Sequence, residues 1–343
     1  MDTRSRTGIA AGGNWIVDRV KTVDVLPGRG MLANIQSESV STGGAPANVL
    51  EDLARLGAGF PLSGYGVVGR DEDGTFIREK FRKLGVDISG IHTHGSACTS
   101  YTDVMSKKGT GDRSFFHNRG ANALFAPDSI DTDALECRIF HLGYLLLLDR
   151  LDEQDDEYGT CAARLLHSLQ HKDIATSADL VSEEGERFMS VVPPALPYIN
   201  FLIINEVEAG RVAGVDVRDG QGELKEKQLM QACEKLADMG NSDLITVHMP
   251  EGAYAVTGKG ERFSRGSLDL PDGYIAGATG AGDAFCAGML YGIHEEYPYE
   301  TSLEIGVCAA AASLSQEDAG SGMKPLEDVL ELGKRYGFRS PPI

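Results

Sequence analysis

The 343-residue chain lacks several features that would each place it in a particular class of protein. It has no basic cluster, and 51 acidic residues outnumber 32 basic ones for a formal net charge of -19. We therefore expect no nucleic-acid partner and no anionic-membrane partner. No apolar run approaches the roughly 18 residues of a membrane span, and the N-terminal stretch carries no long apolar segment. We expect neither a spanning helix nor a signal peptide.

Cysteine is present but shows no pairing pattern. The six cysteines are scattered and form no C-x-x-C pair, which argues against a zinc knuckle and against a disulfide framework. This usage is typical of the reducing cytoplasm. Internal repeats and low-complexity linkers are also missing. No G-x-G-x-x-G follows the first expected strand near Gly12 and Gly13, so a dinucleotide-binding dehydrogenase is disfavoured.

What is present is a globular composition with a regular alternation of strands and helices. Hydrophobic residues make up 42% of the chain and charged residues 24%, enough for a large core. Apolar runs typical of buried strands alternate with amphipathic helical segments, and the last quarter is mostly helical. The expected strands are 8–17, 63–68, 139–148, 173–178, 201–205 and 244–248, and the expected helices include 73–84, 158–170, 226–239, 284–295 and 302–314. This order predicts an α/β fold whose largely parallel sheet carries helices on both faces.

Two polar, β-prone segments interrupt this pattern, at roughly residues 19–42 and 97–120. Their alternation of apolar and polar residues is typical of half-exposed strands rather than of a central sheet. We therefore expect one domain, residues 1–343, with these segments forming a small β lid inserted in the core. A lid with exposed strand edges tends to be covered by a second copy, which favours a homodimer formed through the lid.

The stretch Gly277–Phe285, G-A-T-G-A-G-D-A-F, carries the strongest chemical signal. A helix start presents unpaired backbone N–H groups and a partial positive charge, and glycines let an anion approach them. Gly280, Ala281 and Gly282 could thus form an anion hole beside Asp283. The alternative is a tight turn with Asp283 as a plain helix cap. Three small residues in a row favour the anion hole, because a cap needs only one suitable side chain.

A second glycine-rich helix start lies at Thr42-Gly43-Gly44-Ala45-Pro46-Ala47-Asn48. Taken alone it is more often a sterically required turn. A polar substrate hydroxyl could also bond to these backbone N–H groups and to the Asn48 side chain.

Together these stretches resemble the signatures of the ribokinase-like (PfkB) carbohydrate kinases, G-G-A-P-A-N at 43–48 and T-G-A-G-D-A-F at 279–285. The first strand, with Asn14 and Asp18 at its end, and N-x-x-E at Asn205–Glu208 fit the same family. The resemblance spans about residue 8 to residue 325. It implies a ribokinase-like three-layer α/β/α core with a central mostly parallel sheet and a small β-rich lid. It also implies a cytoplasmic ATP-dependent kinase that places the γ-phosphate of ATP on a hydroxyl of a sugar or sugar-like compound.

The resemblance implies a role for each matching residue. Asp283 would be the base that accepts the proton of the acceptor hydroxyl, and Gly280, Ala281 and Gly282 would hold the transferring phosphoryl group. Glu208 would organise Mg²⁺ through water, as suits a hard cation with few protein ligands. The expected substrate residues are Asn14, Asp18, Gly43, Gly44, Asn48, Arg119 and Asn122. The expected ATP-binding residues are Asn205, Thr246, Gly252, Thr279, Ala309 and Ser313.

The chain also departs from this family. Gly277 stands where the family usually has an aspartate associated with a monovalent cation, which leaves potassium activation doubtful. His248 replaces the usual glycine after the nucleotide strand, and Asp179-Leu180-Val181-Ser182 replaces the common D-x-N followed by arginine. Two alternatives therefore stay open. One is a nucleoside kinase, since the Asn14-x-x-x-Asp18 spacing also resembles adenosine kinases, and the other is a catalytically weak ligand-binding or regulatory protein on the same scaffold.

Overall fold

The central element of the computed structural model is a nine-stranded sheet. The structure describes residues 6–108, 113–182 and 187–343. Seven neighbouring strands run parallel, and a C-terminal hairpin continues the sheet antiparallel at one edge. From edge to edge the strands are β15 (Arg262–Gly266), β14 (Gly252–Thr257), β13 (Leu244–Met249), β12 (Phe201–Asn205), β11 (Ala175–Leu180), β8 (Ile139–Leu145), β1 (Ile9–Gly13), β4 (Leu62–Gly69) and β5 (Asp87–His94).

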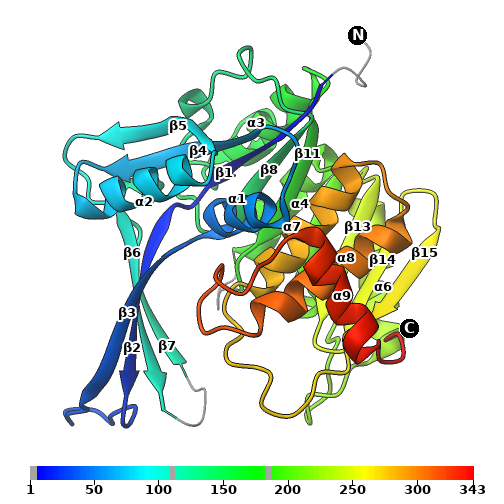
Figure 1. The fold of residues 1–343 in the computed structure, drawn as a ribbon. Helices are drawn as coiled ribbons and strands as arrows, with labels where there is room; N and C mark the ends of the chain where they lie inside the picture. Colours follow the sequence, from blue (N-terminus) through cyan, green and yellow to red (C-terminus); the bar gives the residue numbers. More distant parts are fainter. Residues whose placement is uncertain (1–5, 109–112, 183–186) are drawn as a thin grey trace.

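Helices cover both faces of this sheet and complete three layers (Figure 1). One face carries α1 (Ala45–Leu56), α2 (Glu72–Lys83), α7 (Ala281–His294), α8 (Tyr299–Ser313) and α9 (Leu326–Tyr336). The other carries α3 (Cys161–Gln170), α4 (Phe188–Ala195), α5 (Glu206–Ala213) and α6 (Glu226–Met239). Successive strand residues point to opposite faces, so Ile9 and Ala11 join one hydrophobic core while Ala10 joins the other. The predicted α/β architecture is confirmed.

A separate four-stranded sheet, which we call the lid sheet, projects from the main body (Figure 1). Its order is β3 (Ile35–Gly43), β2 (Ile16–Val23), β6 (Ser100–Lys107) and β7 (Arg113–Asn118). The pairs β2–β3 and β6–β7 are antiparallel, and β2–β6 is parallel. The lid sheet begins three residues before the first predicted lid segment, and residues 109–112 of the second predicted segment lie outside the described residues.

The prediction of a single first strand over 8–17 is wrong, because the chain leaves the central sheet after Gly13. There φ is +136°, and a Cβ would lie 2.3 Å from a backbone oxygen of Gly143. The Asn122 amide then accepts a hydrogen bond from the Trp15 N–H and donates one to the Trp15 carbonyl, at 3.1 Å each. Trp15 therefore cannot pair with a neighbouring strand through its backbone. Asn14 consequently lies at the junction between the two sheets, and Asp18 lies on lid strand β2 rather than on the same strand as Asn14.

Other element boundaries move for local reasons. The helix predicted over 158–170 begins at Cys161, because the Thr160 hydroxyl caps it by accepting from the Ala163 N–H at 3.1 Å. A two-residue pair of strands, β9 (Gln154–Asp155) and β10 (Gly159–Thr160), precedes it. The strand predicted over 139–148 ends at Leu145, since Leu146 adopts a left-handed φ of +79°. Within the described part of the chain, no helix combines the length and apolarity needed to cross a membrane.

Candidate active site

Asp283 lies in the first turn of α7, and its carboxylate points into the protein rather than capping the helix. The N-cap position is Gly280, and within the described residues no side chain caps this helix. Asn48 Nδ2 donates to Asp283 Oδ2 at 2.7 Å. The Tyr144 hydroxyl donates to Oδ2 at 3.0 Å and to Oδ1 at 3.1 Å. The aspartate is 6% exposed, so it belongs to a buried polar cluster and the plain-cap interpretation does not hold.

The surroundings of Asp283 bring the pKa of its carboxyl close to neutral pH. Burial raises the pKa of its carboxyl from 3.8 to about 7, and the charge of Asp179 adds to that rise. The hydrogen bonds from Asn48 and Tyr144 oppose it by favouring the charged form, while the charge of Asp18 raises it further. A carboxylate with a pKa near the working pH is suited to accept a proton from a substrate hydroxyl.

At the start of α7, where the sequence predicted an anion hole, the two glycines have close neighbours that leave little room for a side chain. Gly280 has a φ of +77°, and a Cβ there would lie 2.4 Å from Ala319 Cβ. A Cβ on Gly282 would lie 3.0 Å from the His248 ring. The preceding Thr279 hydroxyl accepts a hydrogen bond from the Arg113 guanidinium of β7, so the lid sheet reaches the loop that leads into the helix.

A cavity of about 210 Å³ opens beside this helix start, at the carboxyl ends of the parallel strands. Ligand sites of open α/β sheets lie at this edge. From the predicted set, the cavity brings together Asn205, Glu208, Gly280, Gly282 and Asp283. Other polar residues that line it are Tyr144, Asp179, Ser182, His248 and Cys286.

Glu208 and Asn205 form a reciprocal cap at the start of α5. Asn205 Oδ1 accepts from the Glu208 N–H at 2.8 Å, and Glu208 Oε2 accepts from the Asn205 N–H at 3.0 Å. Glu208 is nevertheless 4% exposed, and burial raises its pKa to about 8. The described residues contain no group of three or more His, Cys, Asp or Glu side chains able to hold a metal. A carboxylate with mostly water around the ion suits Mg²⁺, which keeps several of its waters.

The predicted substrate residues gather where β1, β2, β3 and α1 meet. A Cβ on Gly43 would lie 2.0 Å from Asp18 Oδ2, and one on Gly44 would lie 2.0 Å from the Asn14 backbone oxygen. Asn14 is fully buried, and neither end of its amide has a hydrogen-bond partner among the described residues. Burial raises the pKa of the Asp18 carboxyl to about 6. Both glycines are thus required by close contact with polar groups of the predicted substrate site.

Two predicted substrate residues have their polar atoms engaged elsewhere. The Arg119 guanidinium forms an ion pair with Asp149, at 2.7 Å between Nη1 and Oδ1. The Asn122 amide holds the backbone of Trp15 from both sides. Asn122 therefore shapes the junction that carries Asn14.

The predicted ATP-binding residues show two unsatisfied hydroxyls. Thr246 in β13 and Ser313 at the end of α8 are buried, and their side-chain oxygens find no partner in the described part of the chain. Ala309 is also fully buried. Gly252 opens β14 with a φ of +149°, where a Cβ would lie 2.1 Å from the Arg265 backbone oxygen. Gly252 is therefore required by the hairpin itself.

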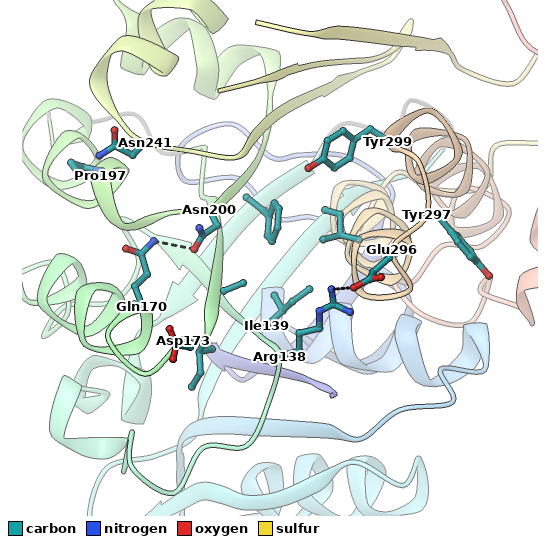
Figure 2. Close-up of a pocket in the computed structure, with 14 residues that line it drawn as sticks. Arg138, Ile139, Gln170, Asp173, Pro197, Asn200, Asn241, Glu296, Tyr297 and Tyr299 are labelled. Carbon is teal, nitrogen blue, oxygen red and sulfur yellow. Dashed lines mark hydrogen bonds and ion pairs between the residues drawn. The ribbon is translucent and has the colours of Figure 1, made fainter. Parts of the chain in front are cut away.

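A larger cavity, of about 790 Å³, lies at the amino ends of the parallel strands and contains none of the predicted site residues (Figure 2). Two pairs of its polar side chains bond to each other. Arg138 pairs with Glu296 at 2.6 Å, and Gln170 donates to Asn200 at 3.0 Å. The size of a cavity therefore does not single out the candidate site, which is recognised by the buried polar cluster around Asp283.

Sequence reasoning missed the parts played by Tyr144 and Asp179. Asp179 was noted only as a departure from a family pattern, and Tyr144 was not singled out. Tyr144 lies in the middle of the predicted strand 139–148, which in the structure ends at Leu145. Asp179 directly follows the predicted strand 173–178, where polar residues of a parallel sheet converge. That position was the available signal.

Known proteins resemble this chain in both sequence and fold. Residues 6–325 match the model of the pfkB family carbohydrate kinases. A ribokinase of Haemophilus influenzae is 25% identical over 331 residues, covering 93% of this chain and 96% of the relative. A probable fructokinase-7 of Arabidopsis thaliana is 27% identical, covering 97% of this chain and 94% of the relative.

Solved structures agree on the fold. The structure of Arabidopsis thaliana ribokinase complexed with ribose and ATP matches with a TM-score of 0.78 at 20% identity, covering 95% of this chain and 98% of that one. A Methanocaldococcus jannaschii nucleoside kinase matches with a TM-score of 0.73 at 17% identity, covering 96% of this chain and 98% of the other.

Proposed function

Because the chain belongs to the pfkB family of carbohydrate kinases, it is an ATP-dependent sugar kinase, and we propose that Asp283 is its base and the backbone of 280–282 its anion hole. Relatives that it matches along nearly their whole length include a ribokinase, an ATP-dependent ribose-1-phosphate kinase and a probable fructokinase.

One observation carries the assignment of the site. Buried polar atoms without partners are rare in folded proteins, and each one calls for an explanation such as a ligand or a water. Four such groups fall on positions predicted from the sequence to bind the two substrates. They are the Asn14 amide and Asn48 Oδ1 on the acceptor side, and the hydroxyls of Thr246 and Ser313 on the nucleotide side.

The residues divide the work of phosphoryl transfer. The acceptor O–H gives its proton to Asp283 as its oxygen bonds to the γ-phosphorus of ATP, and the bond from that phosphorus to the β-phosphate oxygen breaks to release ADP. The backbone N–H groups of 280–282 face the charge that grows on the equatorial oxygens. Glu208 would hold Mg²⁺ through water, and that ion would neutralise charge on the phosphates.

The charges around the acceptor side favour a neutral polyol. Asp18, Asp179 and Asp283 are all close enough to act on the pKa of Tyr144. A phosphorylated or carboxylated acceptor would meet their repulsion.

We also propose that residues 1–343 act as one kinase domain, that the lid sheet closes over the acceptor, and that two copies associate in the cytoplasm through this sheet. Val40 on β3 and Phe116 on β7 are 52% and 60% exposed, and the cross-strand register puts both on the same face of the lid sheet, which supports a covered lid face. We do not expect potassium to activate the enzyme, because Gly277 stands where the family usually has an aspartate. A Cβ on Gly277 would lie 2.9 Å from the Gln316 backbone oxygen, so the chain leaves no room there for an acidic side chain.

A substrate panel tests the function. ADP release is followed with sugars and nucleosides, each with and without Mg²⁺, for the native enzyme and for Asp283→Asn. We expect turnover that requires both Mg²⁺ and one polyol and that is lost in the variant. Saturable binding of nucleotide and sugar in a thermal-shift assay, with no transfer to any acceptor, would instead favour a regulatory protein. Turnover of nucleosides alone would favour a nucleoside kinase.

A further inference from the structure

Tyr144 occupies an unusual position at the edge of the candidate active site. It is a non-glycine residue with a φ of +58°, next to the last residue of β8. Side chains adopt this backbone region rarely, and such residues persist where the surrounding structure holds them, often at functional sites. Here two carboxylates do so. Asp179 Oδ1 accepts from the Tyr144 backbone N–H at 2.7 Å, and Asp283 accepts from its hydroxyl.

The Asp179 carboxylate is itself held from the core side. His141 in β8 places Nε2 3.7 Å from Asp179 Oδ2, and its other ring nitrogen lies 3.1 Å from the Ser177 hydroxyl in β11. All three side chains are at least nine-tenths buried. A chain of contacts therefore runs from the sheet interior through Asp179 and the backbone of Tyr144 to the base.

The contact at Asp283 is selective for one protonation state. The pKa of the Tyr144 hydroxyl lies well above its ordinary value, through burial and then through the neighbouring carboxylates, so the tyrosine stays a donor. A single O–H within 3.1 Å of both oxygens of Asp283 stabilises the ionised carboxylate and fixes its plane. Each carboxylate oxygen can accept two hydrogen bonds, so room remains for an acceptor hydroxyl.

We propose that Tyr144 is a positioning residue for the base: its hydroxyl orients the ionised Asp283, and Asp179 holds Tyr144 in the backbone conformation that allows this. The assignment of Asp283 as base rests on the proposed function, but the contact itself does not. If Tyr144 only filled the core, the loss of its hydroxyl would leave the pKa of the Asp283 carboxyl unchanged.

The test measures the Asp283 carboxyl directly in the ligand-free enzyme, so it needs no acceptor. Protein labelled with ¹³C at the aspartate carboxyls is titrated by NMR, and the Asp283 signal is assigned by its absence in Asp283→Asn. The groups that face Asp283 and titrate or carry charge in the same region are Asp18 of β2, Asp52 of α1, Tyr144 of β8, Asp179 of β11, Glu208 of α5, His248 of β13 and Cys286 of α7.

Two variants should move the Asp283 pKa in opposite directions. Tyr144→Phe removes a donor to the charged form, so the pKa should rise. Asp179→Asn removes a neighbouring negative charge while its amide oxygen can still accept from the Tyr144 N–H, so the pKa should fall. Tyr254→Phe, a buried tyrosine in β14 of the same sheet, is the matched control and should change nothing. With an acceptor from the panel, Tyr144→Phe should lower kcat about tenfold or more with the KM for ATP unchanged, and should move the acid limb of its pH profile upward.

The outcomes separate the two ideas. An Asp283 pKa that is the same in Tyr144→Phe as in Tyr254→Phe overturns the positioning role, whatever the turnover. Should Tyr144→Phe fold poorly, Asp179→Ala is compared with Asp179→Asn. Both remove the charge of Asp179, but only alanine removes the acceptor of the Tyr144 N–H, so equal Asp283 pKa values in the two variants overturn the positioning role as well. If the substrate panel yields no phosphorylated product while the Asp283 pKa shifts in opposite directions in the two variants, the kinase function is contradicted but the contact between Tyr144 and Asp283 is supported.

Discussion

Asn48 and Asp283 lie 235 positions apart in the chain, and their side chains meet at 2.7 Å in the protein interior. One side chain comes from the first turn of α1 and the other from the first turn of α7, and the two helices pack side by side. This contact joins the two glycine-rich helix starts into one site. It also leaves Asn48 Oδ1 without a partner among the described residues, free for a substrate hydroxyl.

Replacing the base should separate activity from stability. Asp283→Asn should lower kcat by about 10²–10⁴-fold while ATP binding is retained. The folded-state pKa of about 7 lies above the ordinary 3.8, so the stability linked to this group is present below pH 3.8 and is lost as pH rises through 7. The variant should therefore gain stability over the native enzyme, by at most about 4 kcal/mol at pH 8 and by less at pH 5. Urea unfolding at both pH values measures this, and an equal difference at both would contradict it.

The pH profile should report the same carboxyl. Because Asp283 must be ionised to accept a proton, kcat/KM should fall about tenfold per pH unit below pH 7 and level off above it. His248, whose pKa burial lowers to about 4, stays neutral and cannot produce this limb. A limb set by Glu208 would lie near pH 8, where burial places the pKa of that carboxyl. Glu208→Gln should lower turnover, because this residue is proposed to hold Mg²⁺, but it should keep the limb near pH 7. A profile that is flat from pH 5 to pH 8 would exclude Asp283 as the base.

Two buried asparagines offer a matched pair. Asn14 has no hydrogen-bond partner in the described structure, whereas both ends of the Asn122 amide bond to Trp15. Asn14→Ala should leave the melting temperature nearly unchanged and raise the acceptor KM about tenfold, because its amide serves the substrate. Asn122→Ala should lose about 1–3 kcal/mol of unfolding free energy. A large loss of stability in Asn14→Ala, with an unchanged KM, would assign Asn14 to the fold instead.

The anion hole should not tolerate a side chain at Gly280. Gly280→Ala adds a Cβ 2.4 Å from that of Ala319, in a backbone region with φ +77°. Gly260→Ala is the control, since its φ of +83° is similar but nothing lies within 4 Å of the added atom. Gly260→Ala should cost about 1–2 kcal/mol of stability and leave kcat alone, whereas Gly280→Ala should lower kcat at least tenfold as well. Equal kcat values in the two variants would remove 280–282 from the mechanism.

Much of the fold follows from local pattern. Apolar runs of strand length alternate with amphipathic helices, and burying both sets at once requires a parallel sheet covered on two faces. Local chemistry also marks the helix starts at Gly44 and Gly280, where glycines precede small residues. These features depend on neighbours within one or two turns, so a single sequence displays them.

The assembled site depends on contacts between distant segments. The Asn14 junction exists because Asn122 takes the backbone of Trp15, 107 positions away, and the first expected strand breaks there. Asp283 has a pKa near 7 because burial removes water and brings Asp179 close, while Tyr144 donates to it from a strained strand end. By itself the sequence determined the layers and the two glycine-rich helix starts, and it singled out Asp283 as the proposed base. Only the tertiary structure decided which polar groups surround that base, because desolvation and charge act through space rather than along the chain.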